Sequence, residues 1–311
     1  FSSQKYYTYD DLPEGVAADA GLEYFSIGEG EPGAPDATKD MKNVVPVLQE
    51  IISINPAVKI MASPWSAPAW MKTSNRISGA GRLRLGEYVG NGYRYQDTID
   101  YVYAQYFVKF IAAYAKLGIR ISSVTMQNEP SNGCPWPITV WTPEELTKWG
   151  SEYLRPAFDR SFPDVEIYFG DDSLRFWQRP ASEYMTPVQA ACFAGAAFHT
   201  YSGLPVWVHN GTRQFPGWKA VMTERRCMLD ESVDEASHVM FGEIGNWLVR
   251  NGESFIALWN LALDERGLPN QVGATGRRGV VTIQHETGEV IRNLEYFMLR
   301  AFGQDVEPGS V

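Results

Sequence analysis

The stretch IDYVYAQYFVKFIAAYAKLGIRISSVTMQNEP, residues 99–130, decides the fold. Its first part, residues 99–118, has the hydrophobic spacing of a long amphipathic helix and ends at Gly118. Its second part, residues 121–130, reads as a buried strand that stops at Asn128, Glu129 and Pro130. A helix followed directly by a buried strand is typical of a parallel sheet with helical crossovers, so the stretch predicts an α/β protein.

The same alternation continues along the chain in both directions. Helical spacing is found over residues 41–52, 142–158 and 235–252, and Thr142 with Glu145 forms a capping box at the start of the second of these. Apolar runs that predict strands lie over residues 58–65, 121–130, 165–172, 191–203, 219–226 and 255–264. This count gives six strands of one parallel sheet.

Polar and aromatic residues fall at the carboxyl ends of these strands, and their placement distinguishes a closed barrel from an open sheet. They are Trp65, Asn128 with Glu129, Asp171 with Asp172, His199 with Tyr201, Glu224 and Trp259. In a (β/α)8 TIM barrel such tips converge on one mouth, whereas an open sheet gathers only two or three of them. We therefore predict a single (β/α)8 barrel domain over residues 1–311 that lacks its first two strands, since eight strands are needed to close a barrel. Residues 279–306 predict a last strand, a turn at residues 286–288 and a final helix.

Composition excludes several function classes. The formal net charge of −10 disfavours nucleic acid as a partner and favours a neutral ligand. No apolar run reaches the roughly 18 residues that a transmembrane segment needs, and the first ten residues do not form a signal peptide. The three cysteines and four histidines show neither Cys-x-x-Cys nor His-Glu-x-x-His spacing, so no metal or other cofactor is expected. One disulfide and any oligomeric state stay open.

Glu129 and Glu224 are the candidate catalytic residues. Two carboxyl groups facing each other across a barrel mouth at about 5 to 5.5 Å suit retaining glycoside hydrolysis, whereas inverting chemistry needs about 6.5 to 9.5 Å. Neighbouring carboxyl groups do not both ionise readily, so one stays protonated as the acid while the other is the charged nucleophile. A lone glutamate is more often an ion-pair partner or a helix cap, but two at strand ends favour catalysis. Asn128 is placed to bind the 2-hydroxyl of a sugar.

Aromatic side chains at strand tips agree with a carbohydrate substrate, because the C–H face of a sugar stacks on such rings. We single out Trp65, Trp70, Tyr201 and Trp259, although ordinary packing is an equal expectation for each.

Four stretches resemble glycoside hydrolase family 30, the group of acid β-glucosidases, glucosylceramidases and β-1,6-glucanases. They are MASPWSAPAWMKT at residues 61–73, VTMQNEP at 124–130, MTE at 222–224 and WNLALDERGLPN at 259–270. The resemblance implies that Glu129 is the acid/base, Glu224 the nucleophile and Asn128 the ligand of the 2-hydroxyl. It also implies that Trp65, Tyr201 and Trp259 line the sugar subsite, while FHTYSG at residues 198–203 supplies His199 and places Tyr201 to hydrogen-bond the nucleophile.

The chain departs from the family at three places. The family has two barrel strands and a subsite aspartate upstream of the position of Phe1, which suggests an N-terminally truncated chain. It also has a β-sandwich side domain, most of which is missing here and towards which residues 280–311 lead. Arg225 and Arg226 follow Glu224 where small or apolar residues are usual.

The implied function is a retaining β-glycosidase that uses no cofactor and is secreted or extracytoplasmic. Glucosylceramide, β-1,6-glucan, aryl β-glucosides and β-xylosides all fit the catalytic pair, so the substrate is a β-linked carbohydrate or glycolipid, and exo and endo action stay open. Residues 79–97 are the expected specificity loop. The alternative is a catalytically decayed barrel that binds carbohydrate.

Overall fold

A parallel sheet of six strands forms the centre of the protein. The computed structural model describes residues 6–28, 39–248, 253–270 and 275–306. The strands are hydrogen-bonded in the order β1-β2-β3-β4-β5-β7, and every pairing is parallel. Their bounds are β1 Ile60–Ala62, β2 Ile121–Thr125, β3 Glu166–Ser173, β4 Gly195–His199, β5 Lys219–Glu224 and β7 Glu253–Ile256. The six strands confirm the number and the places predicted from the sequence.

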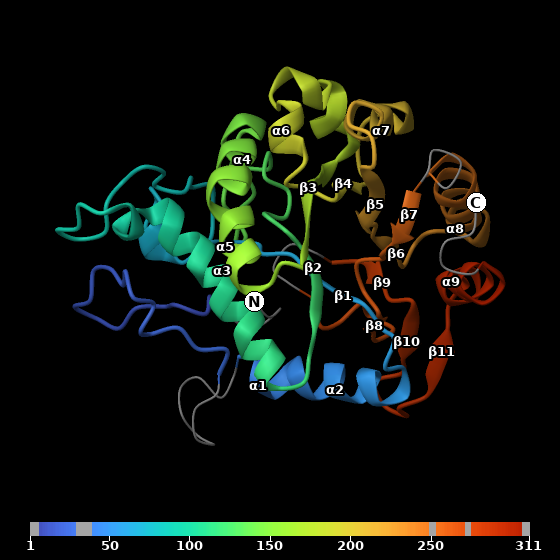
Figure 1. Ribbon diagram of the computed structural model, residues 1–311. Helices are drawn as coiled ribbons and strands as arrows, with labels where there is room; N and C mark the ends of the chain where they lie inside the picture. Colours follow the sequence, from blue (N-terminus) through green and yellow to red (C-terminus); the bar gives the residue numbers. More distant parts are fainter. Residues whose placement is uncertain (1–5, 29–38, 249–252, 271–274, 307–311) are drawn as a thin grey trace.

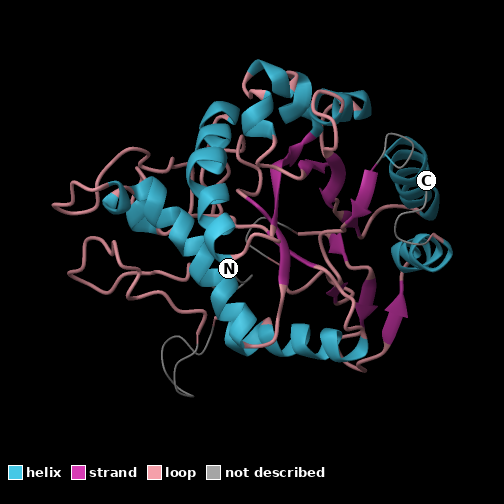
Figure 2. Ribbon diagram, viewed as in Figure 1, coloured by secondary structure: helices cyan, strands magenta, loops and turns pink. Residues whose placement is uncertain are grey.

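Helices cover the outer side of this sheet, and the sheet curls away from them into a half-barrel (Figures 1 and 2). The arrangement is that of a partial (β/α)8 barrel, as the strand-tip residues predicted. The helices are α1 Asp40–Asn43, α2 Val45–Ile54, α3 Ile99–Lys116, α4 Pro143–Trp149, α5 Arg155–Ser161, α6 Pro187–Ala190, α7 Val208–Thr212, α8 Val233–Ser237 and α9 Leu294–Asp305. A π-helical turn over Gly150–Leu154 joins α4 to α5, and a second π-helical segment, His238–Leu248, continues α8. The predicted helix over residues 235–252 thus runs to Leu248, and its last four residues lie outside the described part.

Side-chain caps mark the beginnings of α3 and α4. The Thr98 hydroxyl accepts from the backbone N–H of Tyr101 at the start of α3, and Thr142 and Glu145 form the predicted capping box of α4. Each cap satisfies backbone donors that a helix leaves free in its first turn. At its other end α3 stops before Gly118, whose φ of 77° suits a residue without a side chain.

The predicted strand over residues 255–264 was wrong in its second half. β7 ends at Ile256, and the backbone N–H of Trp259 then donates to the carbonyl of Arg225 instead of a neighbouring strand of the sheet. The chain thereby leaves the barrel sheet and forms β8, Ala262–Leu263, which pairs with β10, Val281–Ile283. β10 also pairs with β11, Val290–Arg292, an antiparallel strand between the predicted turn and the final helix α9 that the sequence did not reveal. A third sheet joins β6, Cys227–Met228, to β9, Arg277–Arg278.

The core has two layers. The larger one lies between the sheet and the helices and contains Tyr103, Trp149, Phe158, Phe169 and Phe198 among its fully buried side chains. The smaller one lies on the inner side of the curl, where Tyr168, Ala197 and Val221 of neighbouring strands pack together. Inward-facing side chains from adjacent strands fill a barrel in such layers, and here the layer towards the carboxyl ends is polar.

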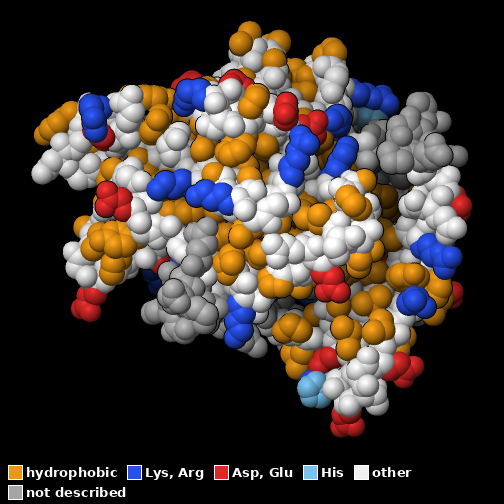
Figure 3. All heavy atoms as spheres, turned by 60° about the horizontal axis from the view of Figure 1, so that its bottom comes forward, with side chains coloured by type: hydrophobic (Ala, Val, Ile, Leu, Met, Phe, Trp, Pro, Cys, Tyr) orange, Lys and Arg blue, Asp and Glu red, His pale blue; other side chains and the backbone are white. Residues whose placement is uncertain are grey.

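The segment around α2 presents hydrophobic side chains to solvent. Figure 3 turns this side of the molecule towards the viewer and shows hydrophobic side chains spread over much of the face. Val44, Val47 and Ile54 are 37%, 51% and 78% exposed. In the described part of the chain, no helix combines the length and the hydropathy required to cross a membrane. Cys134, Cys192 and Cys227 are free thiols.

Candidate active site

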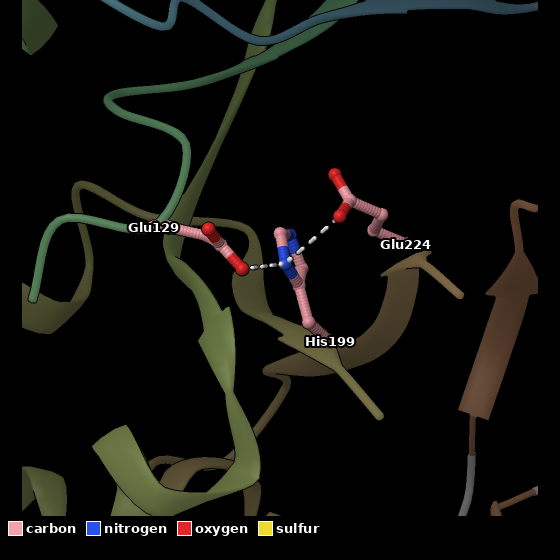
Figure 4. Close-up of side chains that lie close together, drawn as sticks. All are labelled: Glu129, His199 and Glu224. Atoms are coloured by element: carbon pink, nitrogen blue, oxygen red, sulfur yellow. Dashed lines mark hydrogen bonds and ion pairs between the residues drawn. The ribbon is translucent and has the colours of Figure 1, made fainter. Parts of the chain in front are cut away.

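Glu129, His199 and Glu224 converge at the carboxyl end of the sheet (Figure 4). Glu129 lies four residues beyond the end of β2, while His199 and Glu224 are the last residues of β4 and β5. Nδ1 of His199 is 3.4 Å from Oε1 of Glu129 and 3.7 Å from Oε1 of Glu224. One oxygen of each glutamate and one ring nitrogen of His199 all lie within 4.8 Å of one another. Two residues nearly a hundred positions apart thus meet over one histidine.

The backbone at Glu129 turns sharply so that its side chain points into this group. Its φ is 47°, a left-handed conformation that is unfavourable for a residue with a side chain and is typically held only at functional sites and tight turns. The N–H of Glu129 donates to the carbonyl of Asp171 at 2.8 Å, and its carbonyl accepts from Asn132 at 2.9 Å. These two bonds fix the turn, and the Asn132 amide also donates to Oε2 of Glu129 at 2.9 Å.

A β-bulge places Asp171 beneath His199. β3 and β4 shift register between Gly170 and Asp172, so Asp171 is the additional residue, with φ of 62°. A bulge re-aims a side chain that regular pleating would direct elsewhere. Oδ1 of Asp171 accepts from Nε2 of His199 at 3.0 Å.

Asp171 connects five strand ends. Besides His199 of β4, its carboxylate accepts from the hydroxyls of Ser63 after β1 and Thr125 of β2, both at 2.6 Å, and of Thr223 of β5 at 2.5 Å. Sequence reasoning placed Asp171 at a strand tip but did not include it among the site residues. A buried carboxylate at the end of a strand was the available signal, but the bulge that turns it inward is not visible in the sequence.

The surroundings of His199 favour its charged form. Burial lowers the pKa of His199, but the charge of Glu224 and the hydrogen bonds to Asp171 and Glu129 raise it more, so that the pKa lies well above its ordinary value. In the charged form both ring nitrogens carry a proton, and both donate. A buried imidazolium among three carboxyl groups is a paired charge and not an isolated one.

The two glutamates hold protons with different affinities. Burial raises the pKa of Glu224 to about 7, against the lowering effects of His199 and of the Tyr201 hydrogen bond. Burial also raises the pKa of Glu129, but the His199 contact and the Asn132 hydrogen bond outweigh it, and the net direction is downward. A split between neighbouring carboxyl groups was expected, but the higher pKa in the unliganded site belongs to Glu224 and not to Glu129. The reason is that Glu129 has two hydrogen-bond donors besides its charge contacts.

Asn128 offers a free donor beside the carboxylates. Its backbone N–H donates to the carbonyl of Pro64 at 2.8 Å, while its buried Nδ2 finds no acceptor among the described residues. An unsatisfied buried donor is unfavourable, and a bound hydroxyl would satisfy it. The neighbouring Gln127 donates to the carbonyl of Trp65 at 2.7 Å and holds that residue next to the same strand end.

Three of the four aromatic residues lie at the site. The hydroxyl of Tyr201 donates to Oε1 of Glu224 at 2.8 Å, as the family resemblance implied. The rings of Trp65 and Trp259 lie 5.0 Å apart at a tilt of 38°. Trp70 lies elsewhere: it is 7% exposed, packs in the main core and donates through Nε1 to Asp10 at 2.9 Å. Side-chain contacts join Glu129, His199, Glu224 and Tyr201. Trp65 and Trp259 contact each other, and Asn128 directly precedes Glu129, so all seven residues predicted for the site follow or end strands at the sheet's carboxyl end.

Glu129, His199 and Glu224 also form a group in the described part of the chain whose ligand atoms lie close enough together to hold a metal ion, provided that Nδ1 of His199 first loses its proton. Two carboxylates and one imidazole are suitable ligands for a divalent transition metal. The second ring nitrogen of His199 donates to Asp171, an arrangement that also orients metal-bound histidines.

A cavity of the described part of the chain lies apart from the carboxylates. A cavity of about 380 Å³ opens beside β1, the edge strand of the sheet, and its lining includes Tyr7, Tyr9, Asp40, Leu48 and Tyr114. The three tyrosine hydroxyls donate to the Asp40 carboxylate over 2.5 to 2.6 Å. The convergent polar groups at Glu129, His199 and Glu224 identify the candidate active site, and the volume of this cavity does not. The cavity reaches the site along residues 63–66, where Ser63 donates to Asp171 and Trp65 contacts Trp259.

The predicted specificity loop, residues 79–97, pairs through its backbone with neighbouring segments of the chain. Its backbone bridges join Leu83 to Lys72, Arg82 to Val140 and Tyr88 to Thr98. The buried Lys72 donates to Ser66, Ile77 and Ile138 and so ties the surrounding loops together. The role of this loop in specificity stays a prediction.

Comparison with known proteins agrees with the fold. The glycosyl hydrolase family 30 TIM-barrel domain model matches residues 1–286. An endo-1,6-β-D-glucanase of Aspergillus fumigatus is 29% identical over 98% of this chain and 60% of its own length. The lysosomal acid glucosylceramidase of Mus musculus is 29% identical over 87% of this chain and 52% of its own length. The solved structure of an endo-β1,6-glucanase superposes with a TM-score of 0.80 at 25% identity, over 99% of this chain and 65% of that one. The chain thus spans little more than half the length of these curated relatives.

Proposed function

The chain belongs to glycosyl hydrolase family 30 and has the fold of its TIM-barrel domain, and from this premise we propose that it is a retaining β-glycosidase. The observation that carries the proposal is the approach of Glu129 and Glu224 to within 4.8 Å across His199. This approach of one oxygen of each glutamate supports the separation of about 5 to 5.5 Å in retaining enzymes more than that of about 6.5 to 9.5 Å in inverting ones.

In the proposed first step, the Glu224 carboxylate attacks the anomeric carbon of a β-glycoside while the Glu129 carboxyl group protonates the departing oxygen. The bond from the anomeric carbon to that oxygen breaks, and an ester joins the sugar to Glu224. In the second step water attacks the anomeric carbon, Glu129 takes a proton from the water, and Glu224 leaves as a carboxylate. Two inversions give a product with the configuration of the substrate.

The neighbouring residues favour this sequence. Tyr201 donates to one oxygen of Glu224 and leaves the other free to attack, and the hydrogen bond lowers the pKa of Glu224 from the value that burial alone would give. The His199 imidazolium faces both carboxylates. In the unliganded site Glu224 binds a proton more readily than Glu129, whereas the reaction needs the proton on Glu129 and the negative charge on Glu224. The two arrangements differ by the position of one proton over a short distance. Asn128 would donate its free Nδ2 proton to the 2-hydroxyl of the sugar, and Trp65 with Trp259 would form the apolar wall against which the sugar lies.

Substrates of the relatives set the range to be tested. Two of the relatives are named endo-1,6-β-D-glucanase and acid glucosylceramidase. We therefore propose that the substrate is a β-linked glucoside, either a β-1,6-glucan or a glycolipid. We further propose that residues 1–311 form one barrel domain, that residues 280–311 lead towards a side domain, and that the protein is secreted or extracytoplasmic.

The decisive experiment replaces the two glutamates separately. We expect Glu224→Ala to abolish turnover of an aryl β-glucoside, and added azide to restore it with a product of inverted configuration, because azide takes the vacated place of the nucleophile. We expect Glu129→Ala to lose about 100- to 10,000-fold on substrates with poor leaving groups and much less on activated aryl glucosides, which need little protonation. Glu286→Ala, in the exposed turn before β11, is the matched control. Unchanged activity of Glu224→Ala would exclude the assignment, and sugar binding by calorimetry without any hydrolysis by the wild type would favour a binding protein.

A further inference from the structure

Four arginines meet in the small sheet beside Glu224. Arg225 and Arg226 directly precede β6, and Arg277 with Arg278 forms β9. The two strands are antiparallel, with Cys227 opposite Arg278 and Met228 opposite Arg277. Directly opposed residues in an antiparallel pair point to the same face, and successive residues point to opposite faces. Arg225 therefore shares a face with Arg278, and Arg226 shares the other face with Arg277.

Carboxylates of the protein neutralise the charges of Arg225 and Arg278. Arg278 donates to the buried carboxylate of Glu295 at 2.5 Å and lies 4.0 Å from Glu231. Arg225 lies 3.9 Å from the same Glu231 and donates to the carbonyl of Thr200 at 3.2 Å. The side chains of Arg225 and Arg278 are 16% and 15% exposed. These two arginines hold the sheet to its surroundings.

The second pair faces the active site. The guanidinium carbon of Arg226 lies 5.0 Å from the centre of the Tyr201 ring, and that of Arg277 lies 5.4 Å from the centre of the Trp259 ring. Both rings belong to the proposed sugar subsite, and the hydroxyl of Tyr201 donates a hydrogen bond to Glu224. Within the described residues, no carboxylate comes within ion-pair distance of either guanidinium group.

The two arginines therefore place positive charge beside the site in a chain whose net charge is negative. The net charge of −10 repels anions in general, yet two guanidinium groups without an ion-pair contact among the described residues lie beside the rings of the proposed sugar subsite. Burial lowers the pKa of Arg277, and the positive charge of Arg226 lowers it further, whereas Tyr201, Glu224 and Glu129 raise it. The two guanidinium groups therefore repel each other, and an anion close to both would relieve the repulsion.

We propose that Arg226 and Arg277 form a subsite for an anionic group, a carboxylate, sulfate or phosphate, on the β-glycoside that binds at Glu129 and Glu224. The planar guanidinium donates two parallel hydrogen bonds to such an oxyanion, and stacking on an aromatic ring fixes its plane in advance. This inference rests on the proposed function of the same site and specifies the substrate class. It departs from the neutral ligand that overall composition favours, because the proposed substrate carries a local negative charge.

The test compares neutral and charged substrates on the whole chain. The probes are an aryl β-glucoside and its three anionic counterparts, the 6-phosphate, the 6-sulfate and the β-glucuronide, which together separate the sources of the charge. We expect the wild type to prefer at least one anionic probe by kcat/KM, with a KM that rises with ionic strength. In Arg226→Met and Arg277→Met we expect the ratio of charged to neutral kcat/KM to fall at least about tenfold, mainly through KM.

Arg292→Met is the matched control. Arg292 lies in β11 and stacks on Tyr296 at 5.2 Å, so it has the same kind of contact away from the glutamates, and its replacement should leave the ratio unchanged. A wild type that hydrolyses the neutral probe without preferring any anionic one would overturn the subsite while leaving the glycosidase intact. A wild type that binds an anionic probe through the two arginines but hydrolyses none of the four would keep the subsite and reject the proposed function. Equal losses on neutral and charged probes in both variants would show that the arginines act only on the catalytic carboxylates, which also overturns the proposal.

Discussion

Asp171 accepts a 3.0 Å hydrogen bond from His199 in a place where both side chains are only 1% exposed. The imidazolium that results lies between the two glutamates, so the carboxylate that stabilises it influences both of them without touching the substrate. Asp171 is a positioning residue in this arrangement.

Asp171→Asn should therefore lower activity through His199. We expect the pKa of His199 to fall, because the variant loses the negative charge beneath the ring, and kcat/KM to fall by roughly 100-fold, the loss associated with a misplaced catalytic group. Measuring the imidazole titration by NMR together with the pH–rate profile separates this role from simple destabilisation. Asp172→Asn is the control, since the carboxylate of Asp172 is bonded to Ser131 and should move the histidine titration less. An unaltered His199 titration in Asp171→Asn would contradict the role.

Tyr201→Phe tests the hydrogen bond to Glu224. The bond lowers the pKa of Glu224, so its loss should raise that pKa and shift the acid limb of the kcat/KM profile upward by roughly one pH unit. Activity should fall more at pH 5 than at pH 8, because ionised Glu224 is the nucleophile. The aromatic ring stays in place, so the contact with Arg226 is retained. Tyr93→Phe, at a position that is 86% exposed, should leave the profile as it is. A uniform loss at every pH would show that the hydroxyl does not tune the nucleophile.

Glu224→Gln should stabilise the protein at alkaline pH. The pKa of Glu224 is raised from 4.5 to about 7 in the folded state, so its contribution to stability is fully present below pH 4.5 and is lost as the pH rises through 7. Glutamine keeps the shape and accepts the Tyr201 hydrogen bond but does not ionise. We expect the free energy of unfolding to exceed that of the wild type by on the order of 1 to 3 kcal/mol at pH 8, and by much less at pH 4.5. Urea unfolding at the two pH values measures this, with the exposed Glu286→Gln as the control; equal differences at both pH values would argue against a raised pKa.

Local pattern predicted the sheet and the convergence of Glu129 and Glu224 because both depend on short-range signals. The strand before Glu129 and the strand that ends in Glu224 are visible as apolar runs that stop at polar residues, and parallel strands bring such ends together. The break after Ile256 was not predicted, since the apolar run continues to Leu263 while the hydrogen-bond partners change. Asp171 needed a bulge, and the order of the two glutamate pKa values depended on donors such as Asn132, which only the folded chain brings within reach.

The reactivity of the Cys134 thiol reports on the opening of the loop after β2. The thiol is buried only five positions beyond Glu129, and burial raises its pKa to about 12, so at neutral pH it reacts only when that loop opens. The rate of alkylation at Cys134 therefore reports how often the segment carrying Glu129 leaves its closed position. A ligand that bridges the two glutamates should slow this labelling, whether or not it is ever cleaved.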